Sequence, residues 1–147
     1  MKKYSQAIDD EMLSRWYSQR DLWMRCKQDF EWLRSRVNGN DNYVTFGWEF
    51  GQISGLIVQY HLQPNETFRQ VVPLIQEFIE RGFIECGTSE DASFGYRQFT
   101  FNKETLWGTV PLTLRVWPHS QSVACKKVED GTEPKYKFIC IEEGVTV

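Results

Sequence analysis

The chain has 147 residues and a formal net charge of −3, and 41% of its residues are hydrophobic and 15% aromatic. This apolar content excludes a disordered chain, and the length suits one core, so we expect a single domain over residues 1–147. The first ten residues lack the apolar stretch of a signal peptide, and no later run approaches the roughly 20 apolar residues of a membrane span. The sequence therefore predicts a cytoplasmic protein with no membrane contact.

Charge is distributed unevenly along the chain. Residues 1–37 carry eight Lys and Arg against six Asp and Glu, whereas residues 38–147 carry nine against fourteen. Nonspecific nucleic-acid binding draws most of its affinity from Lys and Arg on phosphates. The acidic second segment therefore disfavours nucleic acid as a partner and favours a basic protein.

Residues 6–37 have the pattern of a long helix with one apolar face. The residues of that face are Leu13, Trp16, Trp23, Phe30, Leu33 and Val37. Ser18 and Asp21 resemble a capping box, which would divide the helix in two near Tyr17. We interpret the aromatic residues of the face as core rather than as a binding platform.

Residues 43–62 can be read in two ways. A helix over residues 48–62 would place Gly47, Gly51 and Gly55 on one side, at a cost of about 1 kcal/mol each relative to Ala. A pair of strands would instead alternate the apolar residues Val44, Phe46, Trp48 and Phe50. We favour the helix, because a short polar turn would then join it to the next one.

The clearest helix pattern covers residues 66–81. Thr67 and Gln70 have the spacing of a capping box, and Gly82 supplies the residue that ends the helix. Pro73 lies on the polar side and should bend the helix without disturbing its apolar face. This face would cover a core.

After Gly82 the pattern changes to strands, which alternate apolar and polar residues. We predict an antiparallel sheet of about five strands, at residues 83–86, 96–102, 110–117, 122–128 and 135–142. The last two strands flank Asp130-Gly131, a turn signal, and should form a hairpin. Helices followed by antiparallel strands indicate an α+β fold.

The sequence contains no specific catalytic signature. His61 and His119 lack an acidic or cysteine neighbour at the spacing of metal ligands, and we interpret both as structural or surface residues. The cysteines are widely spaced and are interpreted as reduced thiols: Cys26, Cys86, Cys125 and Cys140. We therefore expect no enzyme activity, no metal site and no cofactor.

The order helix, turn, helix, strand, loop, strand over residues 48–101 is also that of a winged helix-turn-helix. Its second helix would offer Arg69 and Arg81 beside three glutamates, and its wing would present Glu90 and Asp91 where a DNA binder needs Lys or Arg. A DNA-binding regulator is therefore the alternative function, with a small enzyme of unknown chemistry third.

Residues 80–87 read Glu-Arg-Gly-Phe-Ile-Glu-Cys-Gly and follow an amphipathic helix. With the preceding segment from Trp48, this pattern resembles small bacterial immunity proteins of contact-dependent-inhibition and polymorphic toxin systems. In that family, such a helix precedes a β-rich half that contains tryptophan. The resemblance implies a cytoplasmic, non-enzymatic protein that binds a cognate toxin, often a nuclease, and blocks its active site or its access to substrate.

We expect the toxin to bind two acidic turns of the C-terminal half. The candidate residues are Glu90, Asp91, Glu129, Asp130, Glu133 and Tyr136. A nuclease toxin is basic because it binds phosphates, so acidic turns would steer its approach. The other interpretation of these turns is ordinary solvated charge. The sequence leaves the oligomeric state open.

Overall fold

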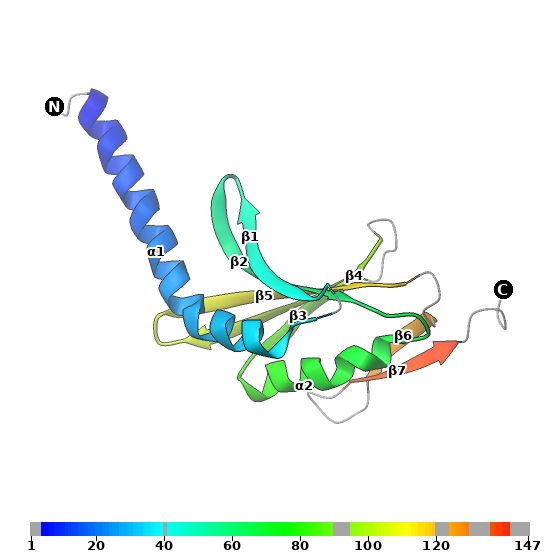
Figure 1. The fold of residues 1–147 in the computed structure, drawn as a ribbon. Helices are drawn as coiled ribbons and strands as arrows, with labels where there is room; N and C mark the ends of the chain where they lie inside the picture. The colour runs from blue at the N-terminus through cyan, green and yellow to red at the C-terminus, as the bar shows by residue number, and fades with distance from the viewer. Residues whose placement is uncertain (1–3, 40, 90–94, 120–123, 130–135, 142–147) are drawn as a thin grey trace.

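The computed structural model describes residues 4–39, 41–89, 95–119, 124–129 and 136–141, and of the last two segments it describes the backbone alone. The elements are α1 (Tyr4–Arg36), β1 (Tyr43–Glu49), β2 (Gln52–His61), the short 3-10 helix η1 (Phe68–Val71), α2 (Val72–Glu80), β3 (Ile84–Ser89), β4 (Arg97–Thr105), β5 (Gly108–Trp117), β6 (Ala124–Glu129) and β7 (Tyr136–Ile141). The predicted α+β class is confirmed, as are all five predicted strands (Figure 1).

The first five strands form one sheet in the order β1-β2-β5-β4-β3, and β6 pairs with β7 in a separate hairpin. Every neighbouring pair in the sheet is antiparallel except β2 and β5, which run parallel. The parallel pair arises because η1, α2 and the β3–β4 hairpin intervene before the chain returns beside β2. The sheet is therefore mixed, although mostly antiparallel.

The predicted helix over residues 48–62 is wrong, because this segment forms the β1–β2 hairpin. Glu49 pairs with Gln52, which leaves Phe50 and Gly51 as a two-residue turn with positive φ angles of 52° and 76°. Such a turn matches the twist of a hairpin, whereas three glycines oppose a helix. Because this helix is absent, residues 48–81 do not form the predicted helix-turn-helix.

The core lies between one face of the sheet and the helices α1 and α2, which lie on the same side of it (Figure 1). Alternate strand residues are buried on that face. They are Leu56, Val58, Phe99, Phe101, Val110, Leu112, Leu114 and Val116. The helical side contributes Cys26, Leu33, Val37, Phe68, Val71, Leu74, Ile75 and Phe78.

Helix α1 runs through 33 residues without the predicted break near Tyr17. Its C-terminal half packs on the sheet, and its N-terminal half projects beyond it (Figure 1). The heptad face is core only in part. Trp23 meets Phe30 and Phe46 edge to face, whereas Trp16 is 57% exposed.

The predicted capping box is present, but it caps η1 rather than a single long helix. Thr67 accepts from the Arg69 backbone N–H, and the Gln70 side chain accepts from that of Thr67. Pro73 then lies in the first turn of α2, where its missing N–H costs nothing, so the expected bend becomes a junction between the two helices. Gly82 follows the helix with a φ of 99°, as predicted.

A buried carboxylate joins three elements of the fold. Asp29 on α1 is 2% exposed, and its two oxygens lie 3.1 Å from Nη2 of Arg81 and 2.5 Å from Nζ of Lys103. The Arg81 guanidinium also lies 4.2 Å from the centre of the Trp32 ring. Arg81 is thus paired with Asp29 and stacked on Trp32, so one of the two cations that the DNA-binding interpretation required is already engaged.

Candidate functional site

Two neighbouring turns expose large apolar side chains. Phe50 in the β1–β2 turn is fully exposed, and Trp48 before it is 61% exposed. In the β4–β5 turn, Leu106 is 98% and Trp107 81% exposed. We call these four residues the hairpin end. Exposed apolar side chains that gather on a surface mark interaction sites on soluble proteins, and each of these two turns carries such a pair.

The backbone of the β1–β2 turn makes Phe50 unusual. A φ of 52° places this residue in the left-handed region. That region costs a non-glycine residue roughly 1–2 kcal/mol, and hairpin turns of this type favour Asn, Asp or Gly at the position. Both the conformation and the exposure of Phe50 therefore oppose a purely structural role. Strained residues of this kind cluster at functional sites.

The β4–β5 turn is held by local hydrogen bonds and by α1. The Thr105 hydroxyl accepts from the Trp107 backbone N–H at 3.1 Å and donates to the Gly108 carbonyl at 2.6 Å. From α1, Arg25 Nε donates to the Thr109 carbonyl at 3.2 Å. These bonds hold Trp107 out toward solvent on a fixed turn.

Two hollows separate the turns from α1. One, of about 400 Å³, is lined by Asp21, Met24, Arg25 and Trp107. The other, of about 580 Å³, includes Arg25, Phe50 and Pro111 in its lining. Because Arg25 lines both hollows, both turns flank the same stretch of α1. The hairpin end therefore combines protruding aromatic groups with recesses that can receive side chains of a partner.

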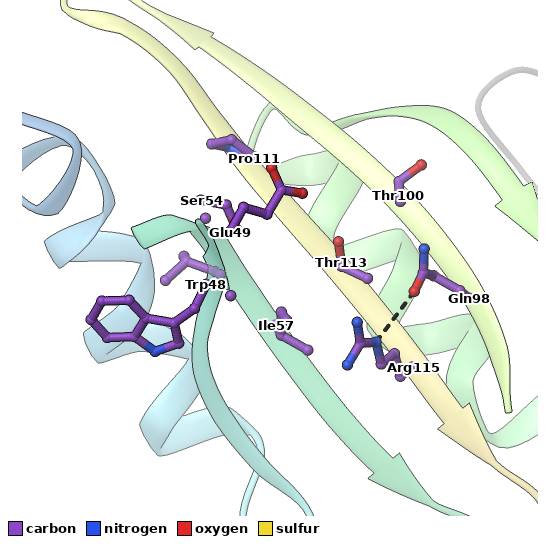
Figure 2. A pocket seen from close by; sticks show the side chains of 12 residues that line it. Trp48, Glu49, Ser54, Ile57, Gln98, Thr100, Pro111, Thr113 and Arg115 are labelled. Atoms are coloured by element: carbon purple, nitrogen blue, oxygen red, sulfur yellow. Dashed lines mark hydrogen bonds between the residues drawn. The ribbon is translucent and has the colours of Figure 1, made fainter. Parts of the chain in front are cut away.

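The other face of the sheet carries a polar groove of about 330 Å³ beside Trp48 and Glu49 (Figure 2). Figure 2 shows Arg115 and Gln98 on neighbouring strands, where Arg115 Nε donates to Gln98 Oε1 at 3.2 Å. Hydroxyl groups line the groove further along, at Ser54, Thr100 and Thr113. The groove therefore offers hydrogen-bonding groups next to the apolar hairpin end.

At the end of β2, His61 packs against an aromatic residue. His61 stacks on Trp117 with ring centroids 5.9 Å apart, and the Trp117 indole donates to Gln59 Oε1 at 2.6 Å. His61 Nδ1 is buried without a hydrogen-bond partner, so the histidine is structural but not fully satisfied. The described residues contain no group of three or more His, Cys, Asp or Glu side chains placed to hold a metal ion.

Four of the six predicted toxin-binding residues lie outside the described residues. They are Glu90, Asp91, Asp130 and Glu133. The predicted hairpin is present, and its register pairs Glu129 with Tyr136 at the end where β6 meets the turn. These two residues therefore lie opposite each other on paired strands, and the turn between them lies outside the described residues.

Sequence reasoning missed the hairpin end. Its signal was Phe50-Gly51 between two alternating apolar runs, together with Leu106-Trp107-Gly108 between two predicted strands. The predicted helix over residues 48–62 leaves no turn at Phe50-Gly51. Without that turn, nothing in the sequence indicated that the turn at Leu106-Trp107 belongs to a larger exposed surface.

Comparisons with protein-family models, curated proteins and solved structures found no match. Among the helices of the described segments, none combines the length and the apolar character needed to cross a membrane.

Proposed function

We propose that this chain is a protein-binding inhibitor, an immunity protein that neutralises a cognate toxin, and that the hairpin end is the centre of its contact surface. The observation that carries the binding role is Phe50, an aromatic residue that is fully exposed in a left-handed turn position. Exposed aromatic anchors of this kind dominate the binding energy of protein interfaces.

The arrangement around Phe50 suits a compact contact surface. Trp48 and Trp107 lie within the same end of the molecule, and hollows lined by α1 flank the turns. Aromatic side chains have few rotatable bonds, so they lose little conformational entropy when a partner buries them, which favours tight association. The neighbouring polar groove with Arg115 and Gln98 supplies hydrogen bonds at the border.

The toxin as partner is supported by the resemblance of the segment ending at residues 80–87 to immunity proteins and by the acidic C-terminal region. A basic nuclease domain would be steered toward acidic turns and then docked by the apolar hairpin end. Bound in this way, the chain would cover the toxin's active site or its path to substrate. A cytoplasmic location forms part of this proposal.

The test is a direct mixture with the toxin domain encoded immediately upstream of this chain's gene. We expect a stable complex on size exclusion and protection of cells that express the toxin. An isolated gene flanked by an operator, or a purified toxin domain that neither binds nor is inhibited, would contradict the proposal and favour a regulator.

The contribution of the acidic turn can be separated from that of the hairpin end. Changing Glu129, Asp130 and Glu133 together to Lys should slow association with the toxin and weaken its salt dependence, with little change in thermal stability. If the triple variant associates at the wild-type rate, the β6–β7 turn does not steer the partner.

DNA binding has a separate test. Steeply salt-dependent binding of duplex DNA would support the regulator. We expect no duplex binding at physiological salt, because Arg81 is engaged by Asp29 and the expected first helix of the motif is a hairpin.

A further inference from the structure

The polar groove on the open face of the sheet contains two opposite charges that do not neutralise each other. Glu49 at the end of β1 and Arg115 on β5 both line this groove of about 330 Å³. Within the described residues, neither side chain takes part in an ion pair. Figure 2 shows Glu49 near Pro111 at one end of the groove and Arg115 at the other. The groove therefore has an acidic end and a basic end.

Arg115 is held in position by groups that carry no charge. Its Nε donates to Gln98 Oε1 at 3.2 Å, and its guanidinium carbon lies 5.0 Å from the centre of the Tyr96 ring. The terminal nitrogens have no further partner among the residues that the structure describes. A guanidinium offers donors in a planar fork that matches the two oxygens of a carboxylate. The basic end is thus prepared for a carboxylate.

Unpaired polar groups lie between the two charges. The hydroxyl groups of Ser54 and Thr113 line the groove and have no hydrogen-bond partner in the described part of the chain. The Gln98 side-chain amide remains available as a donor, because its oxygen accepts from Arg115. Hydroxyl groups both donate and accept, so they can bond either the N–H or the C=O of a peptide group. The middle of the groove therefore suits peptide bonds.

The shape of the groove limits the size of its ligand. Gly47 and Gly55 lie opposite each other on β1 and β2 and place no side chain in the floor. Pro111 and Arg115 are four residues apart on β5, which corresponds to about 13 Å of strand. After the reach of the side chains is subtracted, the two charged ends are on the order of 10 Å apart, and an extended chain of three residues spans about that distance. Ligand pockets in proteins begin at roughly 300 Å³.

We propose that this groove binds a short zwitterionic peptide of about three small residues. Its carboxylate pairs with Arg115 and its terminal ammonium with Glu49, while the hydroxyl groups of Ser54 and Thr113 bond its peptide groups. A ligand with a single charge would leave one end of the groove unpaired. The proposal concerns the chain alone and does not depend on the toxin.

Triglycine is the probe for this site, and nuclear magnetic resonance of the full chain is the measurement. We expect saturable shifts of the Gln98 side-chain amide and of backbone amides around Thr113, with millimolar affinity. Triglycine amide lacks the carboxylate, and N-acetyltriglycine lacks the ammonium. Each should bind about 3- to 5-fold more weakly, the effect of one exposed ion pair. Free glycine is too short to reach both charges and should bind more weakly still.

Two variants assign the ends of the peptide. Arg115→Met should bind triglycine and triglycine amide equally, yet still prefer triglycine to its N-acetyl form. Glu49→Gln should show the reverse pattern, because it removes the partner of the ammonium. Arg34→Met and Glu31→Gln make the same changes at exposed positions of α1 and should behave like the wild type.

Thermal unfolding identifies variants that keep the fold. Glu49 is exposed at the end of an edge strand, so Glu49→Gln provides the test even if Arg115→Met is unstable. Absence of saturable shifts with triglycine, or equal affinity of the wild type for all three peptides, would overturn the proposal. Unchanged peptide preferences in a folded Glu49→Gln or Arg115→Met chain would overturn it as well.

Discussion

Asp29 illustrates how a single residue fixes the position of α1. Its carboxylate is buried, and it accepts from Arg81 after α2 and from Lys103 on β4. A buried charge is costly unless it is paired and hydrogen-bonded, and here both oxygens have cationic partners. The Lys103 ammonium also lies 4.8 Å from the centre of the Phe83 ring. The position of the helix that lines the hairpin end therefore depends on this contact.

We predict that Asp29→Ala lowers the free energy of unfolding by about 3 kcal/mol, since it leaves two partly buried cations unpaired. Glu77→Ala is the matched control, because its ion pair with Arg36 is over one third exposed and should contribute at most about 1 kcal/mol. Urea denaturation of both variants measures the difference. Equal losses of unfolding free energy in the two variants would show that the burial of Asp29 adds nothing to the strength of its ion pairs.

Cys26 gives a second prediction at the scale of one residue. Burial raises the pKa of its thiol from an ordinary 9.0 to about 11. The unfolded chain therefore ionises first, so the thiol leaves stability unchanged below about pH 9 and reduces it between about pH 9 and 11. Relative to Cys26→Ala, the wild type should lose up to about 2 kcal/mol across this interval in denaturant titrations.

Alkylation provides an independent readout for the same thiol. Cys86 is exposed and Cys26 is buried, so peptide mass spectrometry should find Cys86 modified first. Comparable rates at both positions in the native protein would contradict the burial on which the pH prediction rests.

At the scale of elements, local signals predicted some segments well and one segment wrongly. The capping box of Thr67 and the glycine after α2 are local in sequence, so they could be read directly. Residues 48–62 depend instead on pairing with β5, which is distant in the chain. No local sequence pattern predicts that parallel pairing. The four-residue spacing of Gly47, Gly51 and Gly55 is also that of one face of a helix, so it favoured the wrong interpretation.

Gly55 is the position where this long-range pairing can be tested. A Cβ there would lie 2.8 Å from Pro111 Cβ and 2.9 Å from the Pro111 carbonyl oxygen, so the backbones of β2 and β5 would have to separate. We predict that Gly55→Ala destabilises the fold by about 3 kcal/mol, through this clash and its positive φ.

Gly39→Ala is the control for that substitution. Gly39 also has a positive φ, but a Cβ there would meet nothing within 4 Å. Its cost should therefore be limited to backbone strain, about 1 kcal/mol. Thermal unfolding of the two variants separates the cost of the clash at Gly55 from the cost of a positive φ alone at Gly39. Similar melting temperatures of the two variants would contradict the close β2–β5 contact.

At the scale of the whole molecule, composition and patterning predicted the class of fold but not the surface of interest. The α+β order, the strands after Gly82 and the β6–β7 hairpin follow from periodicity and turn residues. The hairpin end forms only when two turns far apart in sequence come to flank Arg25 of α1, which depends on sheet order. Charge counting drew attention to acidic turns, because net charge is visible in a sequence and exposure of Phe50 is not.

We propose that Phe50 serves binding even though its left-handed backbone lowers the stability of the fold. Phe50→Asn tests it most directly, because Asn-Gly is the favoured sequence for this turn. We predict that the variant is more stable to heat or urea by about 1 kcal/mol and yet binds the cognate toxin at least about 30-fold more weakly in titration calorimetry. Unchanged affinity in a variant of unchanged or higher stability would contradict the claim.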